Sequence, residues 1–314
     1  MAPGLRGGLR LNATGRFAPS PTGTLHLGNL RTALLAWLYA RAQGAPFLLR
    51  VEDLDTGRVR PHFEREQLAD LAAIGLDWDG PVVRQSERLE LYEDALARLD
   101  AAGAVYPCWC TRAEIRDASS APHGPLPEGH YPGTCRALTA VQRAEREASG
   151  RPPALRVDAG ATTIAFTDRL HGAQTGVVDD FVVRRNDGAF AYNLAVVVDD
   201  AEQGVGEVVR GDDLIDSTPR QIWLAERLGR GAPSFAHVPL VLGHDGARLA
   251  KRHGAVTLAD RRDQGESDAD VRARLAASVG LTTSPAERPS ASELVARLDP
   301  ETFSPPPSGP LPGL

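Results

Sequence analysis

Residues 19–29 combine prolines, glycines and polar side chains with a histidine, and this is the first place along the chain where chemistry is expected. A short strand is predicted before them at 16–18, and leucines at helical spacing from Leu30 to Leu38 predict a helix after them. The N-terminus of such a helix offers unpaired N–H groups and the positive end of a dipole, which suit a phosphate. Gly28 would let a ligand approach the backbone, and His26 would donate a hydrogen bond to it. The alternative is a tight turn with a surface histidine.

The second candidate is a single lysine. The 35 Lys and Arg residues include one lysine, Lys251, so 34 are arginine, and the only methionine is Met1. A chain that uses arginine for nearly every positive charge keeps a lysine where a compact ammonium serves and a wide planar guanidinium does not. Lys251 falls in a loop between Gly246 and Gly254, after a strand predicted at 239–242. The alternative is chance.

These two segments resemble the two signatures of the class I aminoacyl-tRNA synthetases. Residues 15–23 followed by 26–29 resemble the HIGH region in the form used by the glutamate-specific branch, and residues 248–252 match KMSKS with Lys251 at the fourth position. The chain departs from the pattern at Asn29, where the signature ends in His, and the second signature keeps only Leu249 and Lys251. The resemblance implies that the Lys251 ammonium stabilises phosphates during adenylate formation. The implied catalytic residues are His26, Asn29 and Lys251, and the implied ATP contacts are His26, Gly28 and Lys251.

Four further residues could hold an amino acid with an acidic side chain. Such a substrate needs a carboxylate for its ammonium group and an arginine for a carboxylate, and an aromatic hydroxyl can fix its orientation. Arg16, Glu52, Tyr192 and Arg210 supply this set from the predicted ends of strands, one of them expected at 192–198. Taken singly, each could be a surface ion pair or a core tyrosine. Residues 50–55, 190–200 and 209–214 also resemble the family. The implied glutamate-binding residues are Arg16, Phe17, Ala18, Pro19, Ser20, Glu52, Tyr192 and Arg210.

All three cysteines lie in one Pro- and Gly-rich stretch, as Cys108-x-Cys110 and, after Tyr131, Cys135. Three thiolates and one further ligand suit a tetrahedral zinc ion. From the residues alone, the fourth ligand could be a tyrosine phenolate, His130, His123 or water, and the alternative is three free buried cysteines. The spacing resembles the zinc site of the glutamyl-Q tRNA(Asp) synthetases, which implies one zinc per chain. The implied ligands are Cys108, Cys110, Tyr131 and Cys135.

Several elements must position these side chains. A strand, a helix and a second strand at 46–51 form a βαβ unit, which predicts a parallel sheet with ligands at the carboxyl ends of its strands. The predicted fold class is α/β, a Rossmann-like class I catalytic domain interrupted by a small inserted zinc-binding module of the acceptor-end type. The expected parts are 1–106 and 181–254 for the catalytic domain, 107–180 for the module, and 255–314 for a short helical segment and a tail. Five prolines in the last eleven residues predict that the tail is disordered.

Composition narrows the class of protein. The chain has 314 residues, 42% hydrophobic and 24% charged, which excludes a fully disordered protein, and it has no apolar run long enough for a membrane helix. Three cysteines exclude a disulfide scaffold, and no secretory signal is evident, so we expect a cytoplasmic protein with no membrane partner. Net charge is −6, so a nucleic acid would need a local basic patch. We expect a monomer.

The extent of the resemblance points to one branch of the family. It runs from about residue 15 to 254, and the 60 residues that follow leave no room for the anticodon-reading region of a conventional glutamyl-tRNA synthetase. The resemblance therefore implies the glutamyl-Q tRNA(Asp) synthetases, which activate L-glutamate with ATP, expected with magnesium, and attach it to the queuosine base of tRNA(Asp). One alternative is a truncated synthetase that charges the 3′ end of tRNA. Another is a non-catalytic relative that binds only tRNA or glutamate.

Overall fold

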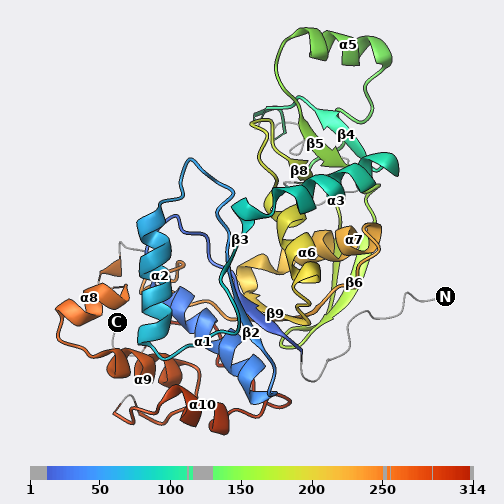
Figure 1. Cartoon of the computed structure of the whole chain (residues 1–314). Helices are drawn as coiled ribbons and strands as arrows, with labels where there is room; N and C mark the ends of the chain where they lie inside the picture. The colour runs from blue at the N-terminus through green and yellow to red at the C-terminus, as the bar shows by residue number, and fades with distance from the viewer. Residues whose placement is uncertain are drawn as a thin grey trace.

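The predicted strand–helix–strand unit is present at the start of the chain. The computed structural model describes residues 13–111, 113–115, 130–249, 253–254, 256–284 and 286–311 (Figure 1). β1 (Gly15–Phe17), α1 (Leu27–Ala42) and β2 (Phe47–Val51) follow in order, and β2 pairs in parallel with β1 and with β3 (Val83–Arg84). Leucines on every side of α1 are buried, as expected of a helix inside a domain. The βαβ prediction is confirmed, whereas Lys251 and His123 lie outside the described residues.

A second sheet continues the first. Its order is β7 (Gly172–Val177), β6 (Thr163–Asp168), β10 (Ser234–Val238) and β9 (Glu207–Gly211). β6, β10 and β9 are parallel, and β7 is an antiparallel hairpin partner of β6. The edge of β9 meets β1, where the Gly206 N–H donates to the Thr14 carbonyl at 2.9 Å. The arrangement is the Rossmann-like α/β fold that the sequence predicted.

One predicted strand is a helix. The residues expected as a strand at 192–198 begin α6 (Tyr192–Glu202), which packs between α3 (Leu89–Ala101) and α7 (Thr218–Arg227). Residues 194–200 are all buried, so the run carries no polar face that would reveal its period. A continuous apolar run is compatible with a buried strand or a buried helix, and the helical neighbours decide between them here.

The inserted module does not coincide with the predicted range 107–180. It is an antiparallel sheet of β4 (Val105–Cys108), β5 (Ala154–Val157) and β8 (Val182–Arg184), with α5 (Ala140–Ala148) at the end of the molecule farthest from α1 (Figure 1). The β6–β7 hairpin, which the boundaries 107–180 assigned to the module, belongs instead to the second sheet, because Asp168 at the end of β6 pairs with Phe235 of β10. The composition does not change between β5 and β8, so the sequence does not indicate that the chain leaves the module there and forms two strands of the second sheet.

The C-terminal segment is also more ordered than predicted. Instead of one helix it has α8 (Leu258–Asp263), α9 (Asp268–Ser278) and α10 (Ala291–Arg297), and these lie beside α1 and α2 (Pro61–Ala73) (Figure 1). Buried leucines of this segment belong to the same hydrophobic cluster as α1. The expectation of a disordered tail is therefore wrong for the described residues, because apolar side chains between the prolines pack into the hydrophobic core.

The last described residues reach back to the catalytic sheet. The Tyr39 hydroxyl of α1 donates to the Phe303 carbonyl at 2.9 Å, and the Leu242 N–H donates to the Gly309 carbonyl at 3.0 Å. The Leu240 N–H donates to the Ser308 hydroxyl at 3.0 Å. The segment after β10, residues 239–242, is thus hydrogen-bonded to the tail. Among the described helices, none has both the length and the apolar character that crossing a membrane requires.

Candidate active site

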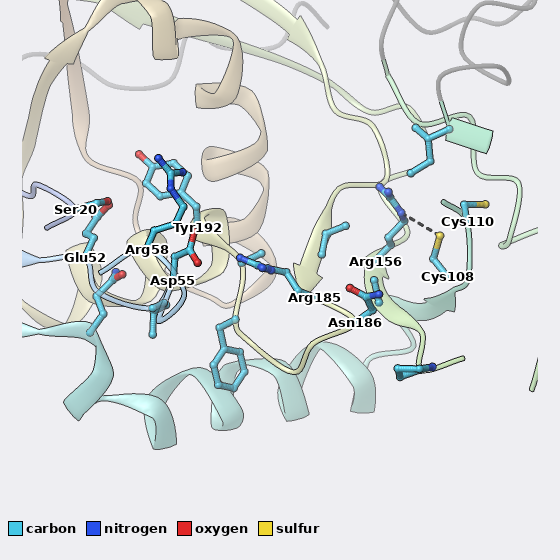
Figure 2. A pocket seen from close by; sticks show the side chains of 18 of the residues that line it. Ser20, Glu52, Asp55, Arg58, Cys108, Cys110, Arg156, Arg185, Asn186 and Tyr192 are labelled. Carbon is cyan, nitrogen blue, oxygen red and sulfur yellow. Dashed lines mark hydrogen bonds between the residues drawn. The ribbon is translucent and has the colours of Figure 1, made fainter. Parts of the chain in front are cut away.

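Two adjoining cavities lie at the carboxyl ends of the parallel strands. The first, of about 720 Å³, is lined by the residues that follow β1, β2, β9 and β10, where an open α/β sheet binds its ligands. The second, of about 900 Å³, extends from there to the inserted module (Figure 2). Ser20, Glu52, Arg58 and Tyr192 line both. The predicted residues from Arg16 to Ser20 line the first cavity, together with Gly28 and Asn29.

His26 is the N-cap of α1, and its ring is held by the helix that it caps. The ring Nδ1 accepts the Asn29 backbone N–H at 3.1 Å, and the Asn29 side-chain oxygen accepts the His26 N–H at 3.2 Å. Burial, together with the nearby charge of Arg248, lowers the pKa of His26 to about 4. The ring is therefore neutral at pH 7, with its proton on Nε2, and that N–H is the group it can donate to a phosphate. The Asn29 side-chain N–H groups can donate as well.

Gly28 allows the His26 ring to sit where it does. A Cβ at position 28 would lie 3.0 Å from two atoms of that ring and 3.4 Å from the Val241 Cβ. We expect Gly28→Ala to displace the ring and lower glutamate-dependent pyrophosphate exchange by about 10²-fold, as displacements near 1 Å do in active sites. Gly57→Ala is the control, because its added Cβ would have only one neighbour, at 3.6 Å. Near-parental exchange by Gly28→Ala would contradict the role given to His26.

A buried ionic network lies under the first cavity. The Arg50 guanidinium donates to Asp200 at 2.8 Å and to Glu52 at 3.4 Å, and Arg16 donates to Asp200 at 3.3 Å. Burial raises the pKa of Glu52, against the charges of Arg50 and Arg16. Burial would also raise the pKa of Asp200, but Arg16 and Arg50 hold it below its usual value. Glu52 is thus a carboxylate that a substrate ammonium would stabilise, and its role in binding glutamate stays a prediction.

Arg210 differs from these arginines, because its hydrogen-bond partners are uncharged. Its guanidinium donates to His237 Nε2 at 3.1 Å, to Gln221 Oε1 at 2.7 Å and to Thr218 Oγ1 at 2.8 Å. Burial lowers the pKa of Arg210. Within the part of the chain that the structure describes, no carboxylate is hydrogen-bonded to it. Its charge therefore stays available to a substrate carboxylate, whereas Arg16, predicted for the same task, already faces Asp200.

Residues before and after Lys251 are held by side-chain contacts beside this cavity. Arg248 pairs with Asp213 at 2.6 Å, and His253 Nε2 lies 3.1 Å from Asp245 Oδ1. Leu249 is buried in the catalytic core. These contacts fix both sides of the segment that carries Lys251, although Lys251 itself lies outside the described residues.

The four implied zinc ligands come together in the module. The Cys108, Cys110 and Cys135 sulfurs all lie within 4.8 Å of one another. The Tyr131 hydroxyl lies 3.4 Å from the Cys108 sulfur and 3.5 Å from that of Cys110. Three soft thiols and a phenol oxygen around one point fit zinc. His130 is not part of the group, and Arg156 donates to Cys108 at 3.3 Å (Figure 2).

Residue types alone gave no role to several members of the site. Asp199 and Asp200 follow directly on the apolar run 194–198 of α6, and two acidic residues in a buried run are a sequence feature that could have indicated an ionic network. Asp168, Thr218 and His237 had no such feature, because they approach Arg210 only when β6, β9 and β10 form one sheet.

The chain is similar in sequence and in structure to proteins of known family. Residues 12–297 match the sequence model of the class I tRNA synthetases (E and Q), catalytic domain. A glutamyl-Q tRNA(Asp) synthetase of Nocardia farcinica is 61% identical over 290 residues, which cover 92% of this chain and 90% of that protein. One of Symbiobacterium thermophilum is 57% identical, over 86% of this chain and 88% of the relative. The crystal structure of a glutamate tRNA ligase from Elizabethkingia meningosepticum in complex with its amino acid is similar, with a TM-score of 0.80 and 28% identity, over 95% of this chain and 67% of that one.

Proposed function

Since this chain belongs to the class I tRNA synthetases, in the family of the E and Q catalytic domains that includes its glutamyl-Q tRNA(Asp) synthetase relatives, we propose that it activates L-glutamate with ATP and transfers it to the queuosine base of tRNA(Asp). The observation that carries the proposal is the pair of adjoining cavities. One joins Glu52 and Arg210 to the His26 turn, and the other leads away from the same Glu52 and Tyr192 toward the module. An activated amino acid at their junction would face an incoming nucleoside.

The first step is adenylate formation. A carboxylate oxygen of glutamate attacks the α-phosphorus of ATP, and pyrophosphate leaves. Glu52 would bind the substrate ammonium, and Arg210, with Arg16 and Tyr192 beside it, would orient its carboxylates. His26, Asn29 and Lys251 would donate to the phosphates, and magnesium would enter with ATP. The backbone of residues 17–20 and of Gly28 would lie close to the bound substrates, along the wall of the first cavity. The protein contributes positioning and electrostatic stabilisation, which are the main sources of rate in such steps.

The second step uses the adjoining cavity. A hydroxyl of the queuosine cyclopentene ring attacks the carbonyl of the mixed anhydride, an ester bond forms, and AMP leaves. Asp55 and Arg58 at the junction, and Arg185 and Asn186 nearer the module, present polar groups along this path (Figure 2). Their mixed charge suits a nucleoside and its phosphates, although the net charge of the chain is negative. That the protein is cytoplasmic and that it is a monomer both stay predictions.

The experiment uses labelled glutamate, ATP and two preparations of tRNA(Asp), one with queuosine and one without it. We expect label only on the modified tRNA, and mass analysis of the digested nucleosides should place the glutamyl group on queuosine. Label at the 3′ end of either tRNA would instead indicate conventional charging. An absence of glutamate-dependent pyrophosphate exchange would overturn the proposal in favour of a binding protein.

We also propose that Cys108, Cys110, Tyr131 and Cys135 hold one zinc ion, which would join β4 to the following loop. Zinc in this setting supplies folding energy rather than reaction chemistry. We expect about one zinc per chain in freshly purified protein. Chelation should increase hydrogen exchange in β4 and β5 while leaving β1 and β2 protected. Absence of zinc, with all three thiols freely titratable, would overturn this assignment.

A further inference from the structure

Two buried residues outside the cavities form a pair behind Arg210. His237 of β10 and Asp168 at the end of β6 are both fully buried, and His237 Nδ1 lies 2.6 Å from Asp168 Oδ2. The Asp168 carboxylate also accepts the backbone N–H groups of Leu170 and His171, each at 3.0 Å, and that of His237 at 3.1 Å. These donors hold the pKa of Asp168 below its usual value in spite of its burial. Asp168 is therefore an ionised acceptor.

The pair fixes the tautomer of the histidine. An ionised carboxylate requires a proton on His237 Nδ1, which leaves a lone pair on Nε2 in the neutral ring. Nε2 lies 3.1 Å from Arg210 Nε and 3.1 Å from the Thr218 hydroxyl. An arginine N–H can only donate, so Nε2 must accept. The Thr218 hydroxyl accepts from Arg210 Nη2 and lies within hydrogen-bond distance of the same Nε2, whose single lone pair faces both groups.

The neutral ring matters for the charge of Arg210. A carboxylate in direct contact would neutralise the guanidinium, and a protonated imidazole would direct an N–H at it. Burial lowers the pKa of His237, and the charge of Arg210 and nearby His171 act in the same direction, while Asp168 opposes them. The Phe235 ring stacks on His237 at 6.0 Å between centroids, so the imidazole has little freedom to turn away.

We propose that Asp168 and His237 are positioning residues for substrate recognition: they orient the Arg210 guanidinium through an uncharged acceptor and so keep its charge for the acidic side chain of the amino acid. The proposal rests on the proposed function, in which Arg210 binds a glutamate carboxylate. A purely structural pair would need only to join β6 to β10. The continuation of the hydrogen-bond chain through Nε2 to a residue that lines the first cavity distinguishes the two roles.

The test compares His237→Leu, which removes the acceptor, with His237→Gln, whose amide oxygen can replace Nε2. Glutamate-dependent pyrophosphate exchange is measured as a function of the glutamate concentration and, separately, of the ATP concentration. We expect His237→Leu to raise the KM for glutamate about 10- to 100-fold, the range for leaving a buried donor without a partner, with the KM for ATP unchanged. His237→Gln should recover most of the loss. His237→Leu should also discriminate less between glutamate and glutamine than the parent does.

His171→Gln is the matched control. This histidine contacts the backbone carbonyl of His237 through Nε2 at 3.0 Å but does not reach Arg210, so its replacement should leave the KM for glutamate within about two-fold of the parent. If His237→Leu and His237→Gln lose activity equally, with parallel changes in the KM for ATP and in the unfolding midpoint, the pair is structural and the proposal fails.

A second measurement needs no variant. Nitrogen-15 NMR of histidine-labelled protein should show His237 with a protonated Nδ1 and an unprotonated Nε2 at pH 7. The opposite tautomer would overturn the proposal even if the variants did not fold. A parent enzyme with no glutamate-dependent exchange would count against the proposed function instead, whereas an active parent with an unaffected His237→Leu variant would count against this inference alone.

Discussion

Lys251→Ala is expected to retain glutamate binding and to lose adenylate formation. Removal of one preorganised donor from a developing charge typically costs about 2.7–4 kcal/mol, or 10²–10³ in rate. Arg248, which pairs with Asp213, and the buried Leu249 lie just before this position, and their contacts do not involve the lysine. The measurement is glutamate-dependent pyrophosphate exchange, with glutamate binding followed by calorimetry. Arg143→Ala on α5 removes a half-buried positive charge far from the site and is the control.

Lys251→Arg should recover little of this activity. It keeps the positive charge, but a planar guanidinium cannot occupy the small volume that an ammonium fills between phosphates. A chain with 34 arginines and one lysine shows that arginine was available at this position. Both variants should unfold at the temperature of the parent. Near-parental exchange by Lys251→Arg would show that charge alone is required, and the presence of the lysine would then need another explanation.

Arg210→Ala is expected to abolish the selectivity for an acidic amino acid. Loss of one partner of a buried charge pair costs about 2–5 kcal/mol, which corresponds to a rise of roughly 30- to several-thousand-fold in the KM for glutamate. The KM for ATP should change little, because His26 and Asn29, which would contact the phosphates, belong to a different element, at the start of α1. Arg230→Ala, which breaks only the ion pair with Glu202, is the control. If Arg210→Ala activates glutamate as well as the parent, the carboxylate is bound elsewhere.

The sequence predicted the parts of the site that depend on local pattern. The turn before α1, the strand–helix–strand unit and the spacing of the cysteines are all short-range features, and the structure confirms where they lie. Glu52 and Arg210 were identified because an acidic amino acid requires their charges. The geometry around the cysteines then favours the Tyr131 hydroxyl over His130 as the fourth ligand.

The remaining features depend on contacts between distant segments. Residues 192–198 belong to a helix that packs against α3 and α7, and the apolar run from Leu194 to Val198 has no periodicity that reveals this. His237 contacts Asp168 across 69 residues, and only the pairing of β10 with β6 brings them together. The tail was expected to be disordered from its prolines, but a few leucines and a tyrosine–phenylalanine contact hold it on α1.

The return of the tail to the catalytic sheet sets an order of events during synthesis. Leu240 finds its hydrogen-bond partner in Ser308, 68 residues further along the chain. A ribosome must therefore release nearly all of the described sequence before residues 239–242, which follow β10 and were predicted to be a strand, can complete their hydrogen bonds. Contacts at such separation form late, because the intervening chain must be closed first. A nascent chain should thus hold its parallel sheet well before it gains a finished loop, and adenylate formation should begin only after the tail has docked.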